Sequence, residues 1–186
     1  MKDYQIYNLP RTLNQSELIE YSKMSKDKFN HLYRGFEHST QFYYLYNFFT
    51  IASCNSQVYN LYQELLKCIR HYFNLYDIEK NNVWLQSWMN IHKSEEVLKS
   101  HSHDYPIHGY ISLSSHVTDT VFTDDHNGSE LYRVRNNPMQ VYIGPGHRHH
   151  HVSIVEPYDD ERVTIGFDIQ NFNTVTDNFS FIPIVL

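Results

Sequence analysis

Cysteine, glycine and long apolar runs are scarce in this 186-residue sequence. Its two cysteines, Cys54 and Cys68, are too few for a disulfide framework or a cysteine-type zinc site, so we expect a cytoplasmic protein kept reduced. No apolar run reaches the roughly 18 residues that span a membrane, and the first residues lack the apolar core of a signal peptide. The 6 glycines and few alanines, beside many asparagines, tyrosines, isoleucines and lysines, point to an AT-rich genome such as that of a phage.

Positive charge is also in short supply. The 15 lysines and arginines face 21 aspartates and glutamates, which gives a net charge of −6 without any block of basic residues. Proteins that bind nucleic acid mainly through its phosphates carry the opposite balance. The sequence therefore gives no strong nucleic-acid signal and no membrane signal, and it does not indicate an oligomeric state.

Aromatic residues are abundant instead, and 16 tyrosines, 11 phenylalanines and 2 tryptophans exclude a disordered chain. The first 80 residues have helical patterns. Asn14 followed by Glu17 resembles a capping box that opens a helix. The aromatic stretch 42–49 predicts a buried helix, although a buried strand would give the same pattern. A period of three to four predicts a helix over residues 57–76 that buries Leu61, Leu65, Ile69 and Phe73 against a sheet.

After about residue 80 the pattern changes to short apolar segments separated by turn residues. It predicts eight strands, at residues 83–91, 107–115, 119–123, 131–135, 139–143, 152–155, 162–169 and 179–185. No helical pattern separates them, so we expect an antiparallel double-sheet jelly roll. The predicted fold class is α+β, with N-terminal helices (1–80) packed on a C-terminal jelly roll, or double-stranded β-helix (81–186), in one compact unit.

Histidine marks the candidate site, because 10 of the 13 histidines lie between His92 and His151. His101 and His103 are two residues apart, so an extended strand would place both on one face. A run of histidines at 147 and 149–151 follows about 50 residues later in the chain. Neutral imidazoles with open coordination positions suit Fe(II), Mn or Ni. The same histidines could also be an adventitious metal site, surface residues or members of a polar network.

Three sequence segments resemble the 2-oxoglutarate/Fe(II)-dependent oxygenases, particularly their compact phage and bacterial members. The first segment, 85–92, reads LQSWMNIH, and the second combines His101-Ser102-His103 with GYISL at 109–113. The third begins with His150-His151-Val152, continues through EPY at 156–158 and ends with RVTIGFD at 162–168. The resemblance covers about 85 residues, fewer than half of the chain, and its third segment is the most specific.

This resemblance implies a jelly roll that binds Fe(II) and 2-oxoglutarate as cofactors. By position, His101, His103 and His150 would bind the metal, and Arg162 would pair with the distal carboxylate of 2-oxoglutarate, as a guanidinium does with fixed geometry. Tyr110, and His108 beside it on the same strand, could face the co-substrate or the substrate, although such residues are more often part of the packing.

The sequence departs from the superfamily pattern at the first ligand pair. The superfamily uses His-x-Asp or His-x-Glu there, whereas this chain has His-x-His. The site must use three histidines, recruit Asp104 or be degenerate. His149 and His151 also remain alternatives to His150, whose His-x-Val context matches best.

We therefore weigh an oxygenase that hydroxylates or oxidises an unidentified small or macromolecular substrate against two alternatives. One is a non-catalytic jelly-roll binding or structural protein with a vestigial site. The other is a cupin-type metalloenzyme that does not use 2-oxoglutarate and has no need of Arg162. In the non-catalytic case Arg162 would pair at the surface with an acid among residues 159–161.

Overall fold

The computed structural model describes residues 2–32, 43–96, 99–171 and 180–186. Its N-terminal part contains β1 (Gln5–Asn8), α1 (Gln15–Leu32), α2 (Phe48–Ile51) and α3 (Ser56–Leu75). Eight further strands follow: β2 (Val83–His92), β3 (Ile107–Ser112), β4 (Thr118–Thr123), β5 (Glu130–Arg135), β6 (Gln140–Pro145), β7 (His149–Ile154), β8 (Arg162–Asn171) and β9 (Phe181–Ile184). Each of the eight predicted strands is therefore found.

The two long helices begin where the sequence predicts. In α1 the Glu17 backbone amide donates to Asn14 Oδ1 at 3.2 Å. In α3 the Asn55 side chain accepts from two backbone amides, which satisfies donors that a helix start leaves free. The predicted apolar stripe of α3 is buried and belongs to the main hydrophobic core, with Leu61, Leu65, Ile69 and Phe73 all at 0% exposure.

Two N-terminal expectations are wrong. Residues 5–8 form β1, which pairs antiparallel with β6, so the first 80 residues are not only helical. This edge strand is short and only half-buried, and it carries too weak an alternation to be recognised. Only the end of the aromatic stretch 42–49 is helical, because Asn47 caps α2; Tyr43 to Leu45 form a turn, and residue 42 lies outside the described residues.

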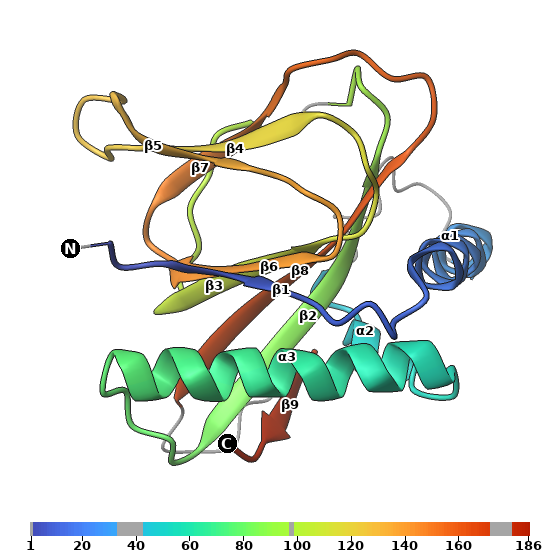
Figure 1. Cartoon of the computed structure of the whole chain (residues 1–186), viewed down its shortest axis with the longest axis horizontal. Coiled ribbons are helices and arrows are strands. Elements are labelled where there is room, and N and C mark those ends of the chain that lie inside the picture. Colours follow the sequence, from blue (N-terminus) through green and yellow to red (C-terminus); the bar gives the residue numbers. More distant parts are fainter. Residues whose placement is uncertain (1, 33–42, 97–98, 172–179) are drawn as a thin grey trace.

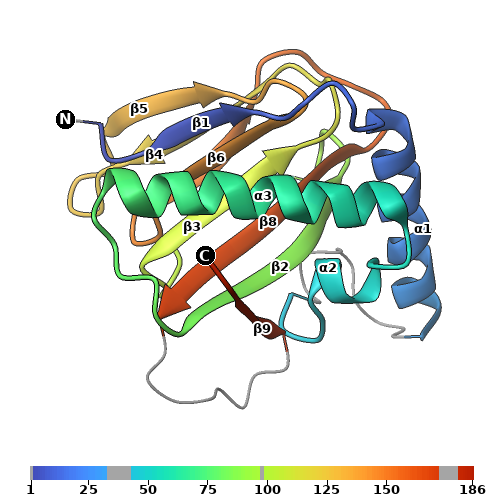
Figure 2. The same ribbon diagram turned by 60° about the horizontal axis from the view of Figure 1, so that its bottom comes forward.

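All the strands pair antiparallel, in two sheets. The larger sheet has the order β1-β6-β3-β8-β2-β9, and the smaller sheet has the order β5-β4-β7. Figure 1 shows the smaller sheet facing one side of the larger sheet, while α3 runs along the opposite side. Figure 2 shows α3 crossing the strands of the larger sheet, with α1 beside its end. This arrangement of helices and antiparallel sheets is a jelly-roll type of fold.

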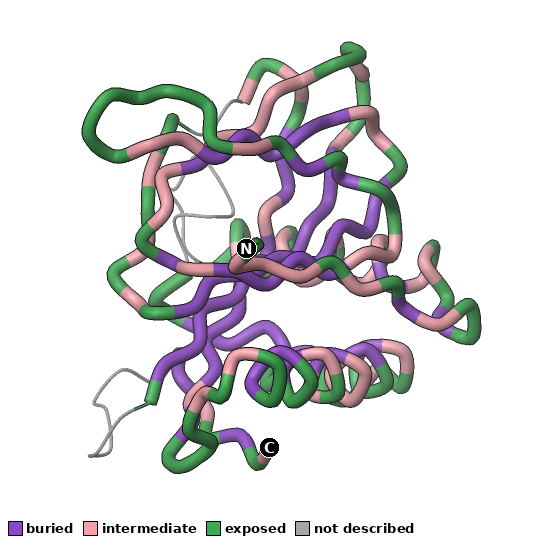
Figure 3. Tube along the Cα trace, turned by 60° about the vertical axis from the view of Figure 1, so that its left-hand side comes forward, coloured by how far each residue is buried: buried purple, intermediate pink, exposed green. Residues whose placement is uncertain are grey.

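The larger sheet has two chemically different faces because successive side chains point to opposite sides. Odd-numbered residues of β8, such as Val163, Ile165 and Phe167, are packed in the core that also contains the helices. Even-numbered residues, such as Arg162, Thr164 and Asp168, line a cavity on the other face. Figure 3 shows long buried stretches in this part of the molecule, and β8 is buried over all its residues except the last. The polar face of β8 therefore points between the two sheets.

The described helices include none with the length and apolar character needed to cross a membrane. Both cysteines have free thiols; Cys54 is exposed and Cys68 is half-buried. Their positions in the helical part of the chain keep them out of the cavity that the two sheets enclose.

Candidate metal centre

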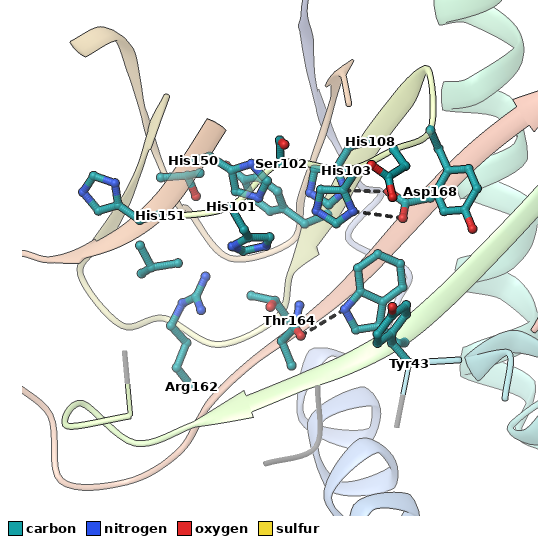
Figure 4. A pocket seen from close by; sticks show the side chains of 17 residues that line it. Tyr43, His101, Ser102, His103, His108, His150, His151, Arg162, Thr164 and Asp168 are labelled. Carbon is teal, nitrogen blue, oxygen red and sulfur yellow. Dashed lines mark hydrogen bonds and ion pairs between the residues drawn. The ribbon is translucent and has the colours of Figure 1, made fainter. Parts of the chain in front are cut away.

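A cavity of about 280 Å³ lies between the two sheets. Residues from β2, β3 and β8 line it on one side, and residues from β4 and β7 line it on the other. Its lining includes each site residue that the sequence predicts: His101, His103, Tyr110, His150 and Arg162. Figure 4 shows these histidines gathered on one side of the cavity and Arg162 reaching in from another.

Three histidines converge although they come from distant parts of the chain. His101 pairs with His150 of β7 through two backbone hydrogen bonds, of 3.1 and 2.8 Å, so their side chains lie next to each other. One ring nitrogen from each of His101, His103 and His150 lies within 4.8 Å of the others. Such a spacing can place three nitrogens around one metal ion.

Hydrogen bonds fix which nitrogen of each ring is free. His101 Nδ1 lies 2.8 Å from the Lys99 carbonyl oxygen, and His150 Nδ1 lies 3.1 Å from the Arg148 carbonyl oxygen. His103 Nδ1 lies 3.0 Å from Asp168 Oδ2. These oxygens can only accept from an imidazole, so Nδ1 donates in each ring and Nε2 keeps its lone pair.

His103 shows most directly that the cluster fits a metal. Its Nε2 atom is buried and has no hydrogen-bond partner among the described residues. A buried polar atom without a partner costs free energy, and a metal ion would remove that cost. Burial and the neighbouring imidazoles also lower the pKa of His150 well below its usual value, and burial lowers that of His101. Both rings are therefore neutral at pH 7, as a metal ligand must be.

The other residues that the sequence offered as ligands are not part of this cluster. Asp104 is exposed and, like His149 and His151, belongs to neither group of potential metal ligands among the described residues. The second group consists of His103, His108 and Asp168. In that group Asp168 already accepts one hydrogen bond on each oxygen, from His103 and from His108.

Arg162 is buried, with 7% exposure, and lines the cavity. The surface ion pair considered above is wrong, because Asp160 pairs with His116 at 2.5 Å and Glu161 pairs with lysines of α1. No carboxylate of the described residues forms an ion pair with Arg162, and a guanidinium stays charged although burial lowers its pKa. Such a group is costly to bury without an anion.

Tyr110 lies in the same part of the cavity. Its hydroxyl is buried close to Thr120, but the two make no hydrogen bond of normal geometry. The Tyr110 hydroxyl and the Arg162 guanidinium are therefore both available to a carboxylate, and Thr164 of β8 also lines this region. This combination of one cation and several hydroxyl groups is suited to binding an organic anion.

Sequence reasoning missed Trp88 and Asp168. Trp88 lies opposite Gly166 in the β2–β8 register, where a Cβ atom on Gly166 would come within 2.6 Å of the indole. The Trp88 ring stacks near His103, with centroids 5.7 Å apart. The signal for Asp168 was present, since residues 162, 164, 166 and 168 of one strand share a face.

No family model and no curated protein matches this sequence. Solved structures do match the fold. A Pseudomonas putida prolyl-4-hydroxylase is similar with a TM-score of 0.61 at 10% identity, over 92% of this chain and 94% of that one. The non-heme monooxygenase ThoJ, in a nickel complex, gives a TM-score of 0.58 at 9% identity over 97% and 76%. SnoN, a non-heme α-ketoglutarate-dependent epimerase from nogalamycin biosynthesis, gives a TM-score of 0.52 at 10% identity, over 91% of this chain and 78% of that one.

At these identities the likeness is one of fold. The neighbours include non-heme enzymes, one of which depends on α-ketoglutarate, another name for 2-oxoglutarate. The chain thus shares its fold with these enzymes and carries a histidine cluster and a buried arginine inside that fold.

Proposed function

We propose that this protein is an Fe(II)/2-oxoglutarate-dependent oxygenase that hydroxylates or otherwise oxidises a substrate. The observation that carries the proposal is the pair of complementary sites in one cavity. Nε2 atoms of His101, His103 and His150 are available to a metal, and the buried Arg162 guanidinium is available to an anion. A non-catalytic jelly roll has no use for either group inside its core.

In this proposal each of the cavity residues has a separate role in binding. His101, His103 and His150 would hold the metal, and three neutral nitrogens with open positions suit Fe(II). Arg162 would bind the distal carboxylate of 2-oxoglutarate through two parallel hydrogen bonds, with Tyr110 donating a third. Bound Fe(II) and 2-oxoglutarate would supply the activation of O₂. The buried aromatic ring of Trp88 would keep bulk water away from the metal.

The metal ligands are tested by replacing His101 and His103 together with alanine. Stoichiometric binding of Fe(II) should then be lost, because two of three ligands are gone. Retained binding would assign the metal to the histidine run at 147–151 instead. The exposed His126, which is in neither cluster, gives the matched control: His126→Ala should leave the stoichiometry unchanged.

The co-substrate is tested by titrating the Fe(II)-loaded protein with 2-oxoglutarate in the absence of O₂. We expect a weak visible charge-transfer band that saturates at one equivalent. Arg162→Ala should leave metal binding nearly intact and weaken 2-oxoglutarate sharply, and Arg162→Lys should restore only part, because a point charge does not reproduce the guanidinium fork.

The same titration separates the alternatives. Metal binding without 2-oxoglutarate binding would contradict the proposal and favour a cupin-type metalloenzyme. Absence of both would favour a non-catalytic binding protein. We also propose a cytoplasmic location, since the free thiols of Cys54 and Cys68 are typical of a reducing compartment.

A further inference from the structure

We propose that Asp168 is a positioning residue of the metal centre. Through its hydrogen bond with His103, Asp168 supplies a negative charge. In sites made of two histidines and one carboxylate, the carboxylate ligand itself supplies that charge. The inference rests on the metal site of the proposed function. It requires neither 2-oxoglutarate nor oxygen chemistry, so it can be tested apart from them.

The surroundings of Asp168 are unusual for a buried carboxylate. Asp168 is 2% exposed, and each of its oxygens accepts one hydrogen bond from an imidazole. His103 Nδ1 lies 3.0 Å from Oδ2, and His108 Nδ1 lies 2.9 Å from Oδ1. No lysine or arginine of the described residues forms an ion pair with it. Its charge is therefore stabilised through two histidines, and one of these is a candidate metal ligand.

This hydrogen bond sets the chemistry of His103. A carboxylate can only accept, so it holds the proton on Nδ1 and directs the Nε2 lone pair to the metal position. It also makes the imidazole a stronger donor to the metal. The ring cannot turn freely, because it stacks on His108 with centroids 3.8 Å apart and planes inclined by 15°.

His108 completes the arrangement. It is buried, and burial together with the neighbouring histidines lowers its pKa to about 4, so the ring is neutral and donates from Nδ1. This second hydrogen bond holds the other oxygen of Asp168 and so fixes the orientation of the carboxylate. Burial raises the pKa of Asp168, but the bonds from both histidines outweigh this effect and keep the carboxyl ionised.

Charge gives the physical reason for such a residue. A metal dication bound by three neutral imidazoles keeps its full charge, whereas a carboxylate ligand would cancel part of it. In a buried site charges interact strongly, because the local dielectric is low. Asp168 places one negative charge a single hydrogen bond beyond His103, which compensates for the missing carboxylate ligand.

A rival arrangement uses the same residues differently. His103, His108 and Asp168 also lie close enough to hold a metal, with Asp168 as a direct ligand. A metal there would displace both of the hydrogen bonds that Asp168 accepts. His101 and His150 would then be dispensable, which gives the experiment a clear discriminator.

The experiment measures the affinity of the full chain for Zn(II), by competition with a chromophoric chelator. Asp168→Asn should weaken binding by about 10- to 100-fold, as loss of an orienting carboxylate does at other histidine ligands. Asp104→Asn is the matched control, because Asp104 is an exposed carboxylate that lines the same cavity. Its affinity should stay within about twofold of the wild type, since an exposed carboxylate is well screened.

A second background makes the test decisive. His103→Asp places a carboxylate ligand beside Asp168, so the two like charges repel each other. In that background Asp168→Asn should strengthen Zn(II) binding, which reverses the sign of its effect in the wild type. A residue with a merely structural role would weaken binding in both backgrounds, and that result would overturn the proposal.

Two further results bear on the proposal. Near-complete loss of binding in Asp168→Asn, with unchanged binding in His150→Ala, would assign the metal to the rival set.

If Asp168→Asn does not fold, His108→Phe carries the test, because it keeps the stacked ring and removes one hydrogen bond to Asp168. We expect it to weaken Zn(II) binding by roughly threefold to tenfold, and an unchanged affinity would overturn the proposal. Failure of the 2-oxoglutarate titration alone would leave these outcomes unaffected.

Discussion

Arg162 offers a test in which stability and ligand binding move in opposite directions. Arg162 is 7% exposed and its guanidinium has no carboxylate partner among the described residues, so the charge is desolvated without full compensation. Methionine has a similar length and no charge. We therefore expect Arg162→Met to raise the free energy of unfolding of the ligand-free protein by about 1–3 kcal/mol, since an apolar side chain of like volume often improves such a site.

The size of the effect follows from the position of the residue. The cost of burying the charge is several kcal/mol in a dry interior, but Arg162 lines a cavity, which admits water and reduces that cost. For a protein of this size, each 1 kcal/mol changes the midpoint of thermal unfolding by about 2–4 °C. The variant should therefore melt about 2–12 °C higher than the wild type.

Chemical and thermal unfolding followed by circular dichroism measure this change. With metal bound, 2-oxoglutarate at 100 times its Kd should stabilise the wild type by about 2.7 kcal/mol, and Arg162→Met should gain almost nothing. Arg133→Met is the matched control, because Arg133 is exposed and paired with Glu130 and Asp119. It should lose less than about 1 kcal/mol and keep the response to 2-oxoglutarate.

The reasoning would be refuted if Arg162→Met lowered the free energy of unfolding by more than 1 kcal/mol in the absence of ligand. Arg162 would then stabilise the fold, and its burial would no longer indicate an anion site. An undiminished response of this variant to 2-oxoglutarate would contradict the assignment of the carboxylate to Arg162.

Four further measurements test the fold and the cavity. Leu65→Ala should lower the free energy of unfolding by about 2–5 kcal/mol in urea titrations, because Leu65 is fully buried; a loss below about 1 kcal/mol would contradict this packing. Limited proteolysis should not yield a stably folded 81–186 fragment, since Leu61 of α3 and Ile165 of β8 share one hydrophobic cluster; such a fragment would disprove the single core. The free energy of unfolding of the metal-free protein should fall as the pH is lowered from 6.5 to about 4, because His108 takes up a proton in the unfolded chain over this range but only near pH 4 in the folded protein. Urea titrations that give the same free energy of unfolding across this pH range would contradict the prediction. Gly166→Ala should displace Trp88 and change its fluorescence, and an unchanged spectrum would contradict the close contact.

The sequence alone determined most of the secondary structure, because local patterns carry it. A period of three to four residues was enough to locate α3 within one residue. Turn residues between apolar segments located eight strands, since a jelly roll places a turn after each short strand. The edge strand β1 was missed because it is short and half-exposed, and the turn before α2 was missed because Asn47 stands within an otherwise aromatic segment.

Part of the candidate site was also visible in the sequence. The spacing of His101 and His103 and the position of Arg162 pointed to the cavity that the structure contains. Asp168 and Trp88 were not recognised, because their roles depend on neighbours in other strands. Local periodicity says which face of a strand a residue occupies, but it does not say which strand lies opposite.

Only the tertiary structure decided which side chains meet. The pairing of His101 with His150, rather than with either adjacent histidine, comes from the register between two segments about 50 residues apart. The hydrogen bond that Asp168 accepts from His108 depends in the same way on the register of β3 and β8, in which the two residues lie opposite each other, while His103 donates to Asp168 from the segment before β3. Register is a property of the whole sheet, set by the packing of its apolar face against the helices, and a one-residue slip would turn each of these polar side chains away from the cavity.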